Sequence, residues 1–206
     1  MTKWIEIFPE NINTRELQEV TDCLRSGGIA IIPTDSIYAI VADLYHKNAM
    51  NKLCKLIGKK PNKANLSILC KDLSNLAKYT NQLPNSVYKV MNRLLPGPFT
   101  FVLQAGKEVP RIFRQNKKTI GIRVPNNPIT QALIQQLGNP LVSSSIHADD
   151  EIQEYLTEPE EIYEEWMNKI DYLVSGGAGA NVGTTVLDAT SADITLIREG
   201  LGYEQL

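Results

Sequence analysis

The sequence has few of the residues that mark a secreted, disulfide-bonded or membrane-spanning chain. Its 206 residues include only three cysteines, Cys23, Cys54 and Cys70, and no two of them form a C-x-x-C pair. An odd number of widely spaced cysteines predicts reduced thiols that pack as small apolar side chains. No apolar run approaches the length of a membrane span, and the chain start lacks the basic and apolar segments of an export signal. We therefore expect a cytoplasmic protein without membrane contact.

Strong net charge, a metal-ligand cluster and the usual phosphate-binding motifs are also missing. The formal net charge is only -2, so any contact with nucleic acid or nucleotide must come from local basic clusters. The glycine-rich segment 176–183 precedes a strand pattern rather than a helix, and no G-x-x-x-x-G-K-[ST] motif occurs. We interpret this segment as a connection between strands. No metal site is expected, and no acid partner for a serine nucleophile is identifiable.

Apolar patterning instead indicates one compact α/β unit in which strand-like and helix-like segments alternate. With 43% hydrophobic residues, a chain of this length can bury one sizeable core. Asn13 or Thr14 is a suitable N-cap for the first helix, and Gly27 is a suitable end signal. We expect strands over residues 4–8, 29–32, 38–42, 66–70, 99–104, 119–124, 141–143, 172–175, 185–188 and 195–198. We expect helices over residues 14–25, 47–57, 73–79, 86–95, 129–137 and 158–168.

The stretch 27–38 contains the most informative local pattern. A Gly-Gly pair precedes the apolar run Ile29 to Ile32, and Pro33 ends it, so the run has the character of a short buried strand. Thr34 and Ser36 then place hydroxyl groups at the end of that strand, where they can meet a ligand. The alternative interpretation is a turn only, because Pro, Asp and Ser also favour turns for local reasons.

Six segments together resemble the YrdC/TsaC family, in the order in which that family has them. They are Pro33-Thr34-Asp35-Ser36-Ile37-Tyr38, Pro96-Gly97-Pro98-Phe99-Thr100, Thr119-Ile120-Gly121-Ile122-Arg123-Val124-Pro125, Pro140-Leu141-Val142-Ser143-Ser144-Ser145, Thr184-Thr185-Val186-Leu187-Asp188 and Arg198-Glu199-Gly200. The resemblance implies a single YrdC-like domain over 1–206, with a twisted mixed sheet flanked by helices around a positively lined cavity. It also implies synthesis of threonylcarbamoyl-AMP from L-threonine, bicarbonate and ATP, for modification of adenosine 37 in certain tRNAs.

The resemblance implies a role for individual residues in this reaction. Arg123 shares one strand face with Thr119, and its planar guanidinium suits the carboxylate of threonine, although a structural salt bridge is the alternative. The residues that the resemblance places around threonine are Thr34, Arg123, Ser143 and Thr184. Those that it places around ATP are Lys59, Thr119, Ser145 and Arg198. No covalent nucleophile is required, and Mg²⁺ would be held mainly by the triphosphate.

Two departures from the family pattern make the chain most similar to the YciO-like branch. The family's Lys-x-Arg pair corresponds to residues 57–61, Ile-Gly-Lys-Lys-Pro, so a lysine replaces the arginine and the bidentate fork is lost. The Ser-x-Asn motif has His147 in place of asparagine, a residue whose role the sequence leaves open. The branch implies an alternative function, a nucleotide- or double-stranded-RNA-binding protein with little synthase activity.

Two charged segments provide further candidate interfaces. Lys55, Lys60 and Lys63 lie in a lysine-rich stretch that is a candidate for contacts with phosphate, tRNA or other structured RNA, or that forms a solvated helix face. Partner proteins of tRNA modification are a related expectation from the resemblance. The acidic helix expected over 158–168 is a weaker candidate for a scaffold surface, since charged helices are usually solvated.

Overall fold

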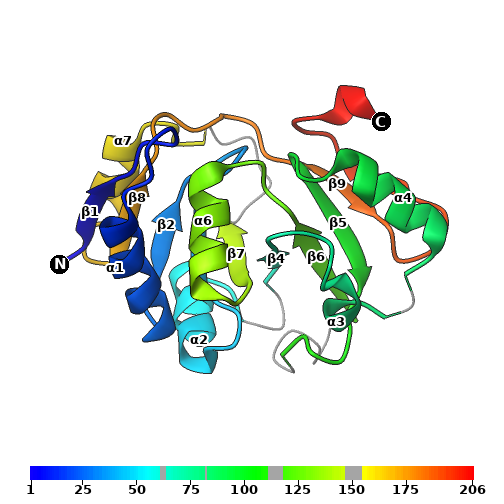
Figure 1. The fold of residues 1–206 in the computed structure, drawn as a ribbon, viewed down its shortest axis with the longest axis horizontal. Coiled ribbons are helices and arrows are strands. Elements are labelled where there is room, and N and C mark those ends of the chain that lie inside the picture. Colours follow the sequence, from blue (N-terminus) through cyan, green and yellow to red (C-terminus); the bar gives the residue numbers. More distant parts are fainter. Residues whose placement is uncertain (61–63, 82, 111–117, 147–154) are drawn as a thin grey trace.

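In the part of the chain that the structure describes, ten strands form the twisted mixed sheet that organises the fold (Figure 1). The computed structural model describes residues 1–60, 64–81, 83–110, 118–146 and 155–206. The strand order is β1-β8-β2-β3-β7-β4-β6-β5-β9-β10, so neighbours in the sheet are mostly distant in the sequence. The strands are β1 (Lys3–Glu6), β2 (Ala30–Ile32), β3 (Ala39–Asp43), β4 (Ser67–Leu69), β5 (Phe99–Gln104), β6 (Thr119–Arg123), β7 (Leu141–Ser145), β8 (Tyr172–Ser175), β9 (Thr185–Asp188) and β10 (Thr195–Arg198).

Helices flank both faces of this sheet. They are α1 (Thr14–Arg25), α2 (Lys47–Leu56), α3 (Leu76–Tyr79), α4 (Asn85–Leu94), α6 (Pro128–Leu137), α7 (Pro159–Trp166) and the short 3-10 helix η1 (Tyr203–Gln205). Asn13 caps α1 by accepting hydrogen bonds from the backbone N–H groups of Arg15 and Glu16. Gly27, beyond its C-terminal end, has a φ of 88°, which glycine adopts without steric cost.

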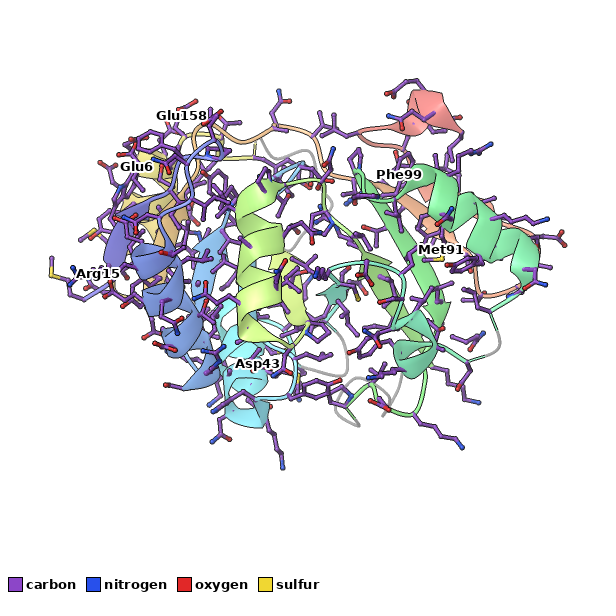
Figure 2. All side chains as sticks on the ribbon, in the orientation of Figure 1. Glu6, Arg15, Asp43, Met91, Phe99 and Glu158 are labelled. Carbon is purple, nitrogen blue, oxygen red and sulfur yellow. The ribbon has the colours of Figure 1, made fainter. Side chains whose placement is uncertain are left out.

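Two apolar cores, one on each face, hold the helices to the sheet. Helices α1 and α6 lie side by side and pack with β2 and β3 through residues such as Val20 and Leu133. The opposite face carries the larger core, in which Met91 of α4 and Phe99 of β5 are both fully buried (Figure 2). Exposed charged side chains such as Arg15 and Glu158 lie on the outside of the molecule. Alternation along each strand therefore decides which core a side chain joins.

The predicted α/β fold is confirmed, and the differences are confined to the ends of elements. Strand β7 continues to Ser145, beyond the expected range 141–143, because Ser144 and Ser145 continue the antiparallel pairing with β3. The helix expected over 158–168 ends at Trp166, and Asn168 has a φ of 67°, which no helix allows. The glycine-rich segment 176–183 connects β8 to β9 without a helix, as predicted.

Candidate functional site

A cavity of about 610 Å³ lies against the sheet. Its wall includes side chains from strands β3, β4, β5, β6, β7, β9 and β10 and from the segment after α2. Ser145 is the register partner of Ala39, which belongs to the core beneath α1 and α6, so the cavity occupies the same face of the sheet as these helices. The polar residues of the wall are Ser36, Lys59, Asn65, Ser67, Thr100, Thr119, Arg123, Ser143, Ser144, Ser145, Thr184 and Arg198.

The floor of the cavity is a row of register partners that crosses four strands. Val102 of β5 lies opposite Gly121 of β6, Gly121 lies opposite Ser67 of β4, and Ser67 lies opposite Ser143 of β7. The hydroxyl of Ser143 donates to the backbone carbonyl of Ser67 at 3.3 Å. A Cβ at Gly121 would lie only 2.6 Å from Oγ of Ser67 and 3.2 Å from Cγ2 of Thr100. The missing side chain of Gly121 therefore makes room at the centre of the floor.

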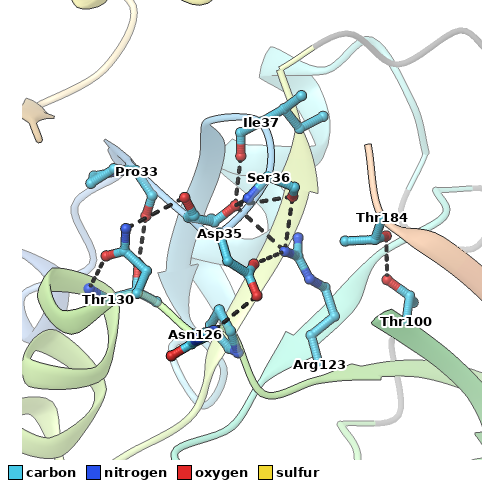
Figure 3. A network of polar contacts seen from close by, with 12 residues as sticks. Pro33, Asp35, Ser36, Ile37, Thr100, Arg123, Asn126, Thr130 and Thr184 are labelled. Atoms are coloured by element: carbon cyan, nitrogen blue, oxygen red, sulfur yellow. Dashed lines mark hydrogen bonds and ion pairs between the residues drawn. The ribbon is translucent and has the colours of Figure 1, made fainter. Parts of the chain in front are cut away.

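A tight turn at the end of β2 closes one side of the cavity, and the N-terminus of α6 holds this turn. Oγ1 of Thr34 donates to the backbone carbonyl of Ile37 at 2.7 Å and accepts from the backbone N–H of Ser36 at 3.1 Å. Thr130, in the first turn of α6, donates its hydroxyl to the carbonyl of Pro33 (Figure 3). Residues 33–36 thus form a turn, and Ser36 of this turn lines the cavity, whereas contact of its hydroxyl with a ligand stays a prediction.

Arg123 projects from the end of β6 to this turn and is almost completely buried, with 7% of its surface exposed. Its Nη2 donates to Oδ1 of Asp35 at 2.9 Å, to Oγ of Ser36 at 3.1 Å and to Oγ1 of Thr34 at 3.4 Å. The second carboxylate oxygen of Asp35 accepts from the backbone N–H of Asn126 at 2.8 Å. Within the described ranges, Nε of Arg123 is buried without a hydrogen-bond partner. Arg123 therefore forms a structural salt bridge with Asp35, which was the alternative to a ligand role for this arginine.

Positive charge dominates the described lining, which contains Lys59, Arg123 and Arg198 but no carboxylate. Arg198 of β10 donates from Nη2 to the backbone carbonyl of Thr184 at 3.1 Å. Burial lowers the pKa of the Arg123 guanidinium, the carboxylate of Asp35 opposes this effect, and the charge of Arg198 adds to it. Two guanidinium groups near one cavity favour an anionic ligand, because such a ligand relieves their mutual repulsion.

Seven of the eight residues assigned to threonine and ATP line this one cavity. They are Lys59, Thr119, Arg123, Ser143, Ser145, Thr184 and Arg198. The eighth, Thr34, is buried beside the cavity and is not among its lining residues, because its hydroxyl is used within the turn. Lys55 and Lys60 lie outside the lining, and Lys63 and His147 lie outside the described residues. Direct contacts of these residues with ligands stay predictions.

Five polar residues of the cavity were not assigned to threonine or ATP from the sequence. They are Ser36, Asn65, Ser67, Thr100 and Ser144. Ser36 and Ser144 lay within segments already selected from the sequence, so their places in those segments were the available signal. The hydroxyl groups of Thr100 and Thr184 form a hydrogen bond with each other, with 2.8 Å between the two oxygens. Ser67 reaches the floor of the cavity only because β4 lies between β7 and β6 in the sheet. No local pattern indicates that strand order.

The chain belongs to the Sua5, YciO and YrdC family, whose model, described as "Telomere recombination", matches residues 22–200. It is 37% identical to the uncharacterised protein YciO of Escherichia coli, over 98% of this chain and 97% of that protein. The crystal structure of that YciO superposes with a TM-score of 0.89 over the same shares of the two chains. A threonylcarbamoyl-AMP synthase of Coxiella burnetii is 28% identical, over 88% of this chain and 96% of the relative.

A solved relative has also been crystallised with an amino acid. The structure of Sua5 from Pyrococcus abyssi complexed with L-threonine matches with a TM-score of 0.88 and 25% identity. The match covers 97% of this chain and 58% of that protein. The family therefore includes threonylcarbamoyl-AMP synthases as well as uncharacterised YciO proteins.

Neither a metal centre nor a membrane-spanning helix occurs among the described residues. No group of three or more His, Cys, Asp or Glu side chains is arranged to hold a metal ion in that part of the chain. None of the helices given above has the length and apolar character needed to cross a membrane. All three cysteines are free, and burial raises the pKa of each thiol, to about 11 for Cys23 and Cys54 and about 12 for Cys70.

Proposed function

We propose that this protein is a nucleotidyltransferase of the threonylcarbamoyl-AMP synthase type, which binds ATP and L-threonine together in the cavity of the sheet. The observation that carries the proposal is the convergence of seven assigned residues from separate strands and loops on one cavity. The existence of synthases in the family, and of a relative crystallised with L-threonine, supports the choice of substrates.

In the proposed reaction, threonine carboxylated on its nitrogen by bicarbonate attacks the α-phosphate of ATP and expels pyrophosphate. Arg198 and Lys59 would neutralise charge on the phosphates, and the hydroxyls of Thr119 and Ser145 would donate to them. Ser143, Thr184 and the turn at Thr34 would orient the amino acid. The main contribution of the protein is alignment of two bound substrates, which does not require a covalent nucleophile.

In the proposed reaction, Mg²⁺ would bind together with ATP. The described cavity lining offers hydroxyl groups but no carboxylate, so the triphosphate and water would supply most of the ligands of the ion. Bound in this way, the ion would reduce the negative charge on the phosphates. The product would serve tRNA modification, with tRNA and other modification proteins as partners, in the cytoplasm.

ATP–pyrophosphate exchange tests this proposal directly. We expect exchange that requires both L-threonine and bicarbonate and that falls at least a hundredfold in Arg198→Ala. Arg25→Ala is the matched control, because Arg25 is an exposed arginine of α1. Exchange that persists without threonine and bicarbonate, or no exchange at all, would contradict the proposal.

A second candidate function is binding of a nucleotide or structured RNA with little synthase activity. The ion pair between Arg123 and Asp35 favours this second function, because Asp35 already binds the guanidinium group that is expected to hold the threonine carboxylate. The lysine at position 59 favours it too, since lysine lacks the two-pronged geometry of arginine. Tight, salt-dependent binding of double-stranded RNA without pyrophosphate exchange would support this candidate over the first.

A further inference from the structure

The hydrogen bonds of Arg123 determine how this side chain can meet a ligand. In the described part of the chain, Arg123 makes its hydrogen bonds through Nη2, which has three oxygen acceptors within 3.4 Å and only two hydrogens to donate. The acceptors all belong to the turn, from Thr34, Asp35 and Ser36. Nη2 is therefore fully used.

A guanidinium group can hold a carboxylate with two parallel hydrogen bonds in two ways. The end-on arrangement uses Nη1 and Nη2, and the side-on arrangement uses Nε and the Nη nitrogen on the same side as its hydrogen, which is Nη2. Both arrangements thus require Nη2. With Asp35 in place, Arg123 has no complete two-pronged edge left for a carboxylate in the cavity.

The position of Asp35 makes it a competitor rather than a co-ligand. Its side chain is only 7% exposed and does not line the cavity, whereas Arg123 does. The buried Nε of Arg123, which has no partner among the described residues, shows that the guanidinium is not saturated in this arrangement. The pair formed by Thr100 and Thr184 lies on the side of Arg123 opposite Asp35 (Figure 3).

We propose that Asp35 competes with the carboxylate of an amino-acid ligand for Nη2 of Arg123 and thereby sets how tightly the cavity binds amino acids. This inference rests on the proposed function, because it takes the ligand to be an amino acid. Asp35 acts through Arg123 and affects only ligands that carry a carboxylate. A ligand carboxylate either displaces Asp35 from Nη2 or accepts single hydrogen bonds.

Calorimetric titration with L-threonine tests the competition, with Asp35→Asn as the main variant. Asparagine has nearly the same shape but only one acceptor oxygen, so when that oxygen accepts from the backbone N–H of Asn126, its NH2 group faces Nη2 and offers it no acceptor. We expect Asp35→Asn to bind L-threonine about tenfold more tightly than the parent protein. Thermal unfolding of both proteins establishes that the variant is folded.

Two controls separate the competition from a general change in charge or shape. L-threoninamide has no carboxylate, so its affinity should be the same in Asp35→Asn and the parent. In the Arg123→Lys background the gain from Asp35→Asn should disappear, because an ammonium group cannot make the two-pronged contact. Each result depends on the fork of Arg123 rather than on the fold of the turn.

The possible outcomes separate this inference from the proposed function. If the parent binds L-threonine and Asp35→Asn binds it equally or more weakly, Asp35 serves only to hold the turn and the inference is wrong. Equal strengthening of L-threonine and L-threoninamide would also overturn it. If neither the parent nor Asp35→Asn binds L-threonine, both the inference and the amino-acid part of the proposed function are wrong.

Discussion

Gly121→Ala is expected to weaken ligand binding at only a small loss of stability. The added methyl would lie 2.6 Å from Oγ of Ser67, where ordinary contact begins at 3.4 Å, and slightly too close to Thr100 at 3.2 Å. Both contacts are with side-chain atoms, and Ser67 can turn to another rotamer. We therefore expect a loss of about 1 kcal/mol in the free energy of unfolding, the low end for overpacking.

The same methyl group would change the centre of the cavity floor. It would fill space between Val102 and Ser67 and force the Ser67 hydroxyl away from a ligand. We expect the affinity for L-threonine to fall by about tenfold or more, since one lost hydrogen bond and one steric contact each cost about 1 kcal/mol. Titration calorimetry gives the affinity, and urea unfolding gives the stability.

Gly138→Ala provides a control with a similar loss of stability at a distant position. Gly138 ends α6 with a φ of 78°, and no atom lies within 4 Å of the place that an added Cβ would take. Alanine there costs about 1 kcal/mol through backbone strain alone. Gly138→Ala should therefore bind L-threonine as the parent does. Unchanged binding in Gly121→Ala, or equally weakened binding in both variants, would refute the reasoning about the floor.

Three further expectations concern buried polar groups, thiols and a backbone contact. Tyr38→Phe should cost about 1–2 kcal/mol in urea unfolding, because the phenol donates to one loop carbonyl at 2.6 Å and accepts from a loop N–H at 3.0 Å. Burial raises the pKa of Tyr38 to about 12, so the parent should lose stability as the pH rises from about 10 to 12, and Tyr38→Phe should lose less over that range. Cys23 should react with a thiol reagent faster than Cys70 at pH 8, because it is less buried and its pKa is raised less; faster labelling of Cys70 would contradict the burial argument. Gly200→Ala should lower the free energy of unfolding by about 2–3 kcal/mol, because the added Cβ would lie 2.4 Å from the backbone carbonyl oxygen of Gly183. Urea unfolding measures this loss, and an unchanged free energy of unfolding would show that the backbone moves enough to remove the clash.

The sequence predicted the elements of this fold well because most carry a clear local signal. Helix α1 has an asparagine cap, an apolar stripe and a glycine end, and all three have their expected structural roles. The helix expected over 73–79 shows the limit of such patterns, since only Leu76–Tyr79 is helical. Strand β7 exceeded its expected range because its length depends on its partner β3. Ends of elements depend on partners that local patterns do not contain.

The candidate site was predictable where it depends on individual segments and not where it depends on their packing. Arg123 and Arg198 were selected from their own motifs, and both line the cavity. The acceptor for Arg123 was not predicted, because it depends on how β6 approaches the turn that contains Asp35. Ser67 was missed for a similar reason, since its place beside Gly121 follows from strand order.

Titration of the protein with ATP and L-threonine, each alone and then in the presence of the other, tests the central claim that one cavity holds both substrates. If the claim is correct, each ligand binds more tightly when the other is present, and Arg123→Ala loses this mutual effect. Independent binding of the two ligands, or binding of neither, would contradict the claim.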